Sequence, residues 1–158
     1  MKSRFLHYAI LAMSLSGCAA PGEHIKRENI ELVQRQHTDL WSNGDLTVID
    51  ESYATDFLGH FPGETVRGPA GIRSSVLAHR TSFPDWTETV EDTIAEGDRI
   101  VTRFRSQGTN LGEFSGKPAT GRRVEITEVC IFRIVDGWIV EQWVYPDLIS
   151  MQRQLHGE

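Results

Sequence analysis

Two strand-like runs near the C-terminus, residues 123–135 and 138–145, carry the side chains best suited to acid–base chemistry. A period of two assigns one face of the first run to Val124, Ile126, Glu128, Cys130 and Phe132. Glu128 is then a carboxyl group among apolar neighbours, which raises its pKa and suits it to proton transfer near neutral pH. The alternative is a salt bridge from Glu128 to Arg103 or Arg105 on the neighbouring strand.

Two further residues complete the predicted catalytic set. His60 follows the extended stretch that begins at Thr55, and imidazole is the side chain that most readily exchanges protons near neutral pH. A lone histidine is also common at a protein surface or at the edge of a core. Asp147 stands before a helix-like segment, where a carboxylate accepts hydrogen bonds from the first free N–H groups. Capping explains Asp147 better than catalysis, although the two roles are compatible.

The second run adds candidate ligand contacts. Val140, Gln142 and Val144 share the parity that we expect to face inward. The amide of Gln142 suits a ligand oxygen or a neighbouring polar group, and the thiol of Cys130 is more typical of a small core residue than of a reactive group. The remaining predicted contacts are aromatic or apolar side chains, which the pattern assigns to core or pocket without separating the two: Trp86, Phe104, Phe132, Trp143 and Tyr145.

The composition argues against several other classes of protein. The six histidines are scattered without a close pair, so no zinc site is predicted. The stretch GPAGIR lacks the lysine and the spacing of a phosphate-binding loop, and we expect no cofactor. The net charge is −6 and no basic run is interleaved with aromatic residues, which argues against nucleic acid as a partner.

The elements that must position these residues form an α+β pattern. Helical periodicity predicts three helices in the first half, from His24 to Asn43, from Asp45 to Tyr53, and from Pro69 to Phe83. The period then changes to two, which predicts four antiparallel strands over 86–94, 99–109, 123–135 and 138–145 before a short terminal helix over 147–155. The stretch PGETVRG between the second and third helices is expected to be a loop.

The first twenty residues predict export. A positive start is followed by the short apolar stretch Phe5–Leu15 and by Leu15-Ser16-Gly17-Cys18, which resembles a lipobox. We therefore divide the chain into a lipoprotein signal peptide (1–18), a tether (19–23) and one domain (24–158). Lipid on Cys18 would anchor the protein to the bacterial envelope membrane, facing the periplasm from the outer membrane in a diderm cell. An ordinary cleaved signal is the alternative.

From about His24 onward the chain resembles the SnoaL-like polyketide cyclases, also called the ester cyclase family, of the nuclear transport factor 2-like superfamily. The stretches that carry the resemblance are LWSNGDLTVIDESYATDFLGH, FPDW, VEDTIAEGDRIVTRFRSQGTNLGEF, PATGRRVEITEV, IFRIVDGWIVEQW and PDLISMQRQL. The resemblance implies a cone of helices inside a strongly curved, mostly antiparallel sheet, with a deep pocket. It also implies a homodimer formed through the outer face of the sheet.

The same resemblance implies an intramolecular aldol reaction, in which an aspartate on the last strand exchanges protons and a histidine on the preceding strand assists. These two positions fall at Val144 and Cys130 in this chain, so the aldol-cyclase mechanism is not supported as such. Two hypotheses follow. The protein is either a cofactor-independent cyclase, isomerase or hydrolase for a small apolar carbonyl compound, or a lipid-anchored protein that binds a small apolar ligand without chemistry. A third hypothesis is a structural or assembly role at the membrane, with the face of the sheet as the interface.

Overall fold

A computed structural model describes residues 21–157 of the chain, and the predicted signal peptide with Cys18 lies outside this range. The elements are helices α1 (Pro21–Arg35), η1 (Gln36–Ser42), α2 (Thr47–Ser52), α3 (Gly68–Ser82) and α4 (Leu148–His156), and strands β1 (Tyr53–Phe61), β2 (Glu64–Arg67), β3 (Thr87–Glu96), β4 (Arg99–Thr109), β5 (Arg123–Val135) and β6 (Trp138–Pro146). Together they form the predicted α+β fold.

The strands form one mixed sheet in the order β2-β1-β6-β5-β4-β3. The four long strands that the sequence predicts are β3 to β6, and they pair antiparallel in succession. The stretch PGETVRG was expected to be a loop, but it contains the edge strand β2, which forms a hairpin with β1. A tight turn at Pro62-Gly63, with Gly63 at φ +80°, reverses the chain directly after β1 and so allows this hairpin. Strand β1 runs parallel to β6, which the sequence did not predict.

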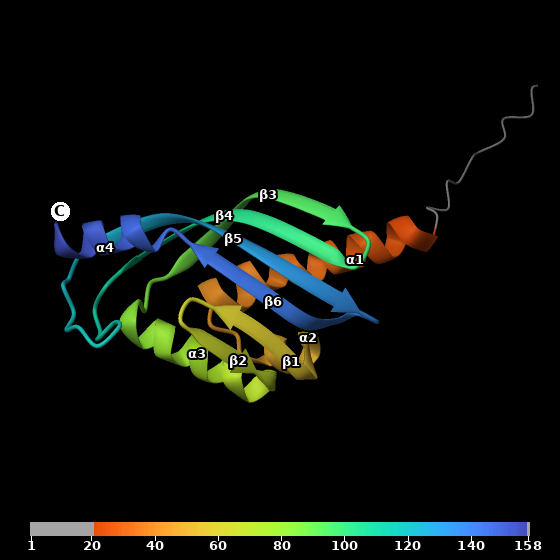
Figure 1. The fold of residues 1–158 in the computed structure, drawn as a ribbon, viewed down its shortest axis with the longest axis horizontal. Helices are drawn as coiled ribbons and strands as arrows, with labels where there is room; N and C mark the ends of the chain where they lie inside the picture. The colour runs from red at the N-terminus through yellow and green to blue at the C-terminus, as the bar shows by residue number, and fades with distance from the viewer. Residues whose placement is uncertain (1–20, 158) are drawn as a thin grey trace, which may run out of the picture.

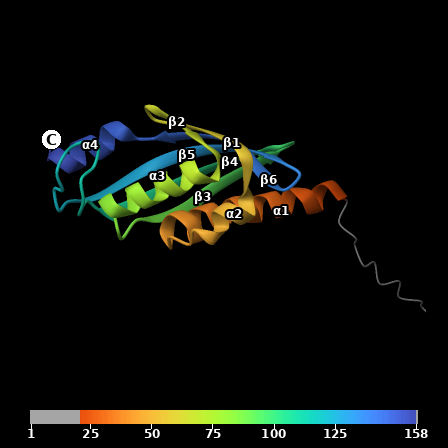
Figure 2. The same ribbon diagram turned by 90° about the horizontal axis from the view of Figure 1, so that it is seen from below.

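Helices α1, α2 and α3 cover one face of this sheet, as the view from below shows (Figure 2). The core lies between the two layers, because alternate residues of β4 and β5 are buried along most of their length. The predicted inward face of β5, which includes Glu128 and Cys130, is confirmed by this alternation. On β6 a bulge shifts the register so that Ile139, not Val140 as predicted, is buried beside Ile134.

The first helical stretch differs from the prediction at both ends of α1. The helix begins at Pro21, so it includes residues 21–23 of the predicted tether. After Arg35 the hydrogen bonding loosens into the π-helical segment η1, which buries Gln36, His37 and Leu40 together. The segment ends at Ser42, and Gly44 follows in the left-handed conformation with φ at +75°.

Helix α4 lies at one end of the molecule, far from the start of α1 in both views (Figures 1 and 2). It packs on β5 through Met151 and Leu155, which join a second apolar cluster with Phe83 and Trp86. The loop that joins β4 to β5 crosses the same end, where Asn110 holds it through hydrogen bonds to the Gly112 carbonyl and the Thr120 N–H. This end of the sheet therefore has its own small core, separate from the main one.

Candidate functional site

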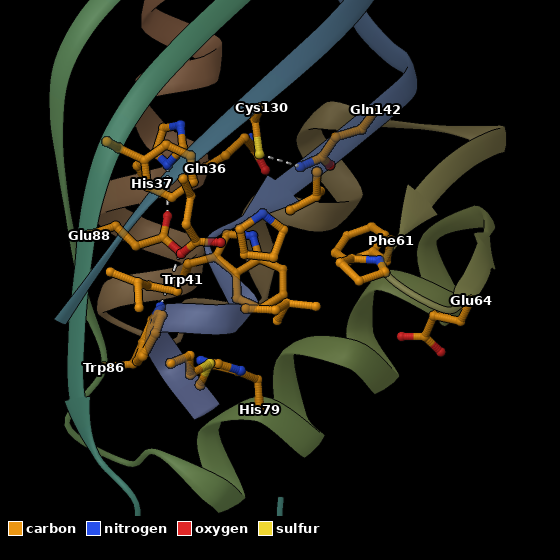
Figure 3. Close-up of a pocket in the computed structure, with 18 of the residues that line it drawn as sticks. Gln36, His37, Trp41, Phe61, Glu64, His79, Trp86, Glu88, Cys130 and Gln142 are labelled. Carbon is orange, nitrogen blue, oxygen red and sulfur yellow. Dashed lines mark hydrogen bonds and ion pairs between the residues drawn. The ribbon is translucent and has the colours of Figure 1, made fainter. Parts of the chain in front are cut away.

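A cavity of about 300 Å³ opens between the curved sheet and the helices (Figure 3). Most of its wall is apolar and aromatic, and a few polar groups converge on it. The lining residues on the helices and the β1–β2 hairpin are Gln36, His37, Trp41, Phe61, Pro62, Glu64 and His79. Those on the rest of the sheet, its loops and α4 are Trp86, Glu88, Phe104, Phe114, Ser115, Ile126, Glu128, Cys130, Phe132, Gln142, Val144, Pro146, Leu148 and Met151.

Glu128 lies on the cavity wall, as the sequence predicted. It is opposite Phe104 in the β4–β5 register and only 8% of its surface is exposed. Burial raises the pKa of its carboxyl to about 8, with a smaller contribution from the negative charge of Glu88, and the nearby Ser106 hydroxyl offsets only part of this rise. The alternative salt bridge is absent, because Arg103 and Arg105 point to the other face of the sheet and pair with Glu91 there.

A buried His37–Glu88 pair faces the same cavity, and the sequence analysis did not select either residue as a candidate (Figure 3). The Nδ1 atom of His37 lies 2.7 Å from Oε2 of Glu88, and its Nε2 atom lies 3.1 Å from the Thr102 hydroxyl. The indole N–H of Trp86 donates to the other oxygen of Glu88 at 3.2 Å. Both oxygens of Glu88 therefore have a hydrogen-bond partner, whereas Glu128 has no such pair of partners.

Signals for this pair were present in the sequence. His37 shares the periodic face of its helix with Val33 and Leu40, which is an unusual place for a histidine. Glu88 has the same parity as Val90 on its strand and therefore faces the core. One polar residue on the buried face of a helix and another on the buried face of a strand are weak evidence for a functional site. Only the folded structure shows that the side chains of His37 and Glu88 meet.

Aromatic residues surround a third polar group, His79 of α3. Its ring stacks on Phe83 at 5.2 Å and meets the edges of Trp41 and Trp86 at 5.7 and 4.5 Å. Burial lowers the pKa of His79 to about 4, so the ring is uncharged at neutral pH. Trp41 and Phe61 continue this aromatic side toward the β1–β2 hairpin (Figure 3).

Gln142 and Cys130 meet on the sheet side of the cavity (Figure 3). The amide N–H of Gln142 donates to the Cys130 sulfur at 3.6 Å. The amide oxygen of Gln142, Oε1, accepts a hydrogen bond from the Tyr53 hydroxyl at 3.3 Å. Burial raises the pKa of the Cys130 thiol well above its usual value, which favours the uncharged core residue over a reactive thiolate. Cys130 and Val144 are register partners, so the two positions that the resemblance assigns to a histidine and an aspartate lie side by side on the cavity wall.

Of the eight predicted ligand contacts, six line the cavity: Trp86, Phe104, Cys130, Phe132, Gln142 and Val144. Trp143 and Tyr145 do not, because their parity on β6 is opposite to that of Gln142 and Val144. Trp143 lies on the outer face, between His60 and Arg99. The guanidinium carbon of Arg99 is 5.0 Å from the centroid of the Trp143 ring. Tyr145 is 57% exposed.

Two predicted catalytic residues also lie outside the cavity. His60 alternates with the inward residues Gly59 and Phe61 on β1, so it reaches the outer face, where it stacks on Trp143 at 5.3 Å and bonds Glu141 at 3.0 Å. Asp147 caps α4, because its carboxylate accepts the Ser150 N–H at 2.9 Å. The expected capping role of Asp147 is therefore confirmed, whereas a pocket position for either residue is wrong.

The part of the chain that the structure describes holds no cluster of three or more histidine, cysteine or acidic side chains placed to bind a metal ion. None of its helices is both long and apolar enough to cross a bilayer. The polar groups of the cavity therefore include no recognisable metal-binding set within residues 21–157.

Comparisons with known proteins agree on one family. The model of the SnoaL-like polyketide cyclase family matches residues 31–155. The aklanonic acid methyl ester cyclase DnrD of Streptomyces peucetius is 28% identical over 132 residues, which cover 80% of this chain and 89% of DnrD.

Two solved structures extend this likeness to the fold. A SnoaL-like protein from Jannaschia sp. CCS1 has a TM-score of 0.80 at 25% identity, covering 90% of this chain and 99% of its own. IdmH from Streptomyces antibioticus has a TM-score of 0.70 at 32% identity, covering 81% of this chain and 98% of its own. With a nuclear transport factor 2-like fold and a family match over most of its length, this chain belongs to the SnoaL-like polyketide cyclase family.

Proposed function

We propose that the protein is a cofactor-independent acid–base enzyme that enolises a small, mostly apolar carbonyl compound in the cavity. The observation that carries this proposal is Glu128, a carboxyl group that faces an apolar cavity without a basic partner in the described residues. Its pKa of about 8 keeps it protonated at neutral pH, which is the form that a general acid needs. The substrate named for the relative DnrD, a methyl ester, is a carbonyl compound of this kind.

The two cavity carboxyl groups suggest how the proton transfers balance. Glu128 gives its proton to the carbonyl oxygen as an O–H bond forms, and Glu88 takes a proton as the neighbouring C–H bond breaks. The product is the neutral enol, and the reverse transfers restore both acids. His37 and Trp86 each contact one oxygen of Glu88, which holds its carboxyl group in place.

This assignment replaces the proton donor of the aldol cyclases rather than copying it. Val144 cannot exchange a proton, and Glu128 reaches the cavity from the adjacent strand, two positions along from Cys130. Enolisation is a step that cyclases and isomerases share, so the proposal covers both classes.

Deuterium exchange tests the proposal without knowledge of the natural substrate. The probe is 2-acetonaphthone in D₂O at pH 7, with loss of its methyl proton signal followed by NMR. We expect the protein to accelerate exchange, Glu128→Gln to abolish the acceleration, and His60→Ala to retain it, since His60 lies on the outer face.

Binding of the ketone without faster exchange would contradict the enzyme proposal. That outcome would favour the second hypothesis, in which the cone holds an apolar ligand without chemistry. Quenching of tryptophan fluorescence measures the binding separately, because Trp41 and Trp86 line the cavity.

A further inference from the structure

The cavity wall carries acidic side chains but no side chain with a fixed positive charge. Glu64, Glu88 and Glu128 line the cavity, with Glu128 protonated at neutral pH because its pKa is about 8, and among the described lining residues there is no lysine or arginine. Of the two lining histidines, His79 is uncharged at neutral pH and His37 is bound to Glu88. This excess of acidic over basic side chains bears on which charge a bound ligand can carry.

One arginine beside a lining residue, Arg80, is bound to backbone groups outside the cavity wall. Arg80 follows His79 on α3, but its guanidinium donates to the backbone carbonyls of Trp41 and Ser42 at 3.1 and 2.9 Å. It also donates to the carbonyl of Pro84 at 3.2 Å. These three bonds direct Arg80 away from the cavity, and a ligand anion would find no guanidinium there.

The negative charge of Glu88 acts on other groups of the cavity wall. Burial is the main cause of the raised pKa values of Glu128 and Cys130. The charge of Glu88 is the next cause for Glu128, and for Cys130 it follows burial and the Glu128 carboxyl. Both groups face the cavity from β5, so a ligand atom beside them experiences the same repulsion of negative charge. In an apolar environment of low effective dielectric, this repulsion is much stronger than in water.

The aromatic part of the wall acts in the same direction. Trp41, Phe61 and Trp86 present π-systems to the cavity, and the faces of such rings attract cations and repel anions (Figure 3). A protonated amine could in addition pair with Glu128 in its ionised form, which would compensate two buried charges at once.

We propose that the cavity selects its ligand by the sign of charge, with Glu88 as the selecting residue: it admits uncharged and positively charged compounds and excludes anions. The substrate class is therefore esters, ketones, amides or amine-bearing compounds, and not the corresponding free acids. This inference rests on the proposed function only in taking the cavity as the ligand site, and it requires no turnover.

Calorimetric titration with three probes on one ring system tests the proposal. The probes are 2-naphthamide, 2-naphthylmethylammonium and 2-naphthoate at pH 7, which are uncharged, cationic and anionic. We expect the amide and the ammonium to bind at least about tenfold more tightly than the carboxylate. Equal affinity for amide and carboxylate would overturn the proposal, and so would equally weak binding of ammonium and carboxylate, because that would indicate simple exclusion of charge.

The variant Glu88→Gln identifies the source of the selection. It should reduce the ratio of ammonium to carboxylate affinity by at least about threefold, because one negative charge leaves the cavity wall. The matched control is Glu96→Gln, the same change at an exposed position of the same strand, which should leave the ratio unaltered. An unchanged ratio in Glu88→Gln would overturn the assignment to Glu88. If that variant fails to fold, the three-probe comparison on the wild-type protein still decides whether the cavity selects by the sign of charge, and absence of deuterium exchange would not affect that result.

Discussion

Glu88 and Glu128 are the same residue type in one cavity, but their surroundings differ. Glu88 has hydrogen-bond partners in His37 and Trp86, whereas Glu128 is surrounded mainly by apolar groups and by the charge of Glu88. The proposed enolisation assigns Glu128 the role of proton donor and Glu88 that of proton acceptor. This proposal needs no carboxylate at position 144, where the chain has a valine.

The raised pKa of Glu128 predicts how stability depends on pH. Between about pH 4.5 and pH 8 the unfolded chain loses this proton while the folded chain retains it, so the free energy of unfolding falls as the pH rises through that window. Glu128→Gln removes this dependence. Urea unfolding should show the variant gaining stability over wild type from pH 5 to pH 8, by on the order of 3 kcal/mol.

A matched control separates this effect from general titration. Glu96→Gln, which also removes one carboxyl group, should follow the wild-type pH profile because Glu96 is exposed. If Glu128→Gln also follows the wild-type profile, Glu128 is not a protonated buried acid.

Single residues differed in how well the sequence predicted them. Glu128 was placed correctly because the alternation along β5 is regular over thirteen residues. His60 was placed wrongly, although Phe57 and Phe61 on the same strand indicate by their parity that it faces outward. His37 and Glu88 were missed because they are 51 residues apart and meet only through packing of a helix on a strand.

At the level of elements, capping of α4 allows a direct test of Asp147. Asp147→Ala should lower the free energy of unfolding by about 1 kcal/mol, because the Ser150 N–H loses its acceptor. Asp147→Asn should retain most of the stability, since its amide oxygen also caps. Neither variant should alter ligand affinity, measured with 2-naphthamide, and a loss of affinity without loss of stability would instead indicate a pocket role.

Elements with a strong local pattern were predictable, and those fixed by neighbours were not. The bounds of β4 and β5 match the prediction because long alternating runs end at clear turn residues. The edge strand β2 has only four residues, so its pairing with β1 decides its conformation. The π-helical segment and the bulge in β6 add single residues to regular elements, and the periodicity of a sequence does not reveal such insertions.

At the scale of the whole molecule, the family and the cone were predictable from ordered motifs that cover nearly the entire domain. The homodimer that the resemblance implied stays a prediction. The location of the protein also stays a prediction, because Cys18 lies outside the described residues.

The lipobox-like stretch predicts a lipid anchor on Cys18. In a bacterial host, mass spectrometry of the membrane fraction should find a mature N-terminus at Cys18 with the mass of a diacylglyceryl group. Cys18→Ala should prevent this processing and remove the lipidated form. The buried Cys130→Ala is the control for loss of a thiol and should leave the anchor intact. An unmodified Cys18, or a mature N-terminus elsewhere, would contradict the prediction.

The π-helical segment Gln36–Ser42 makes the shape of the cavity sensitive to chain length. A π-turn holds one residue more than an α-turn, so deletion of a single residue there would let the segment close into a regular α-helix. Residues on one side of the deletion would rotate by about 100° relative to those on the other side. Gln36, His37 and Trp41 could then no longer all face the ligand. Insertions and deletions in this turn are therefore a route by which relatives of this protein could acquire a new ligand without changing any lining side chain.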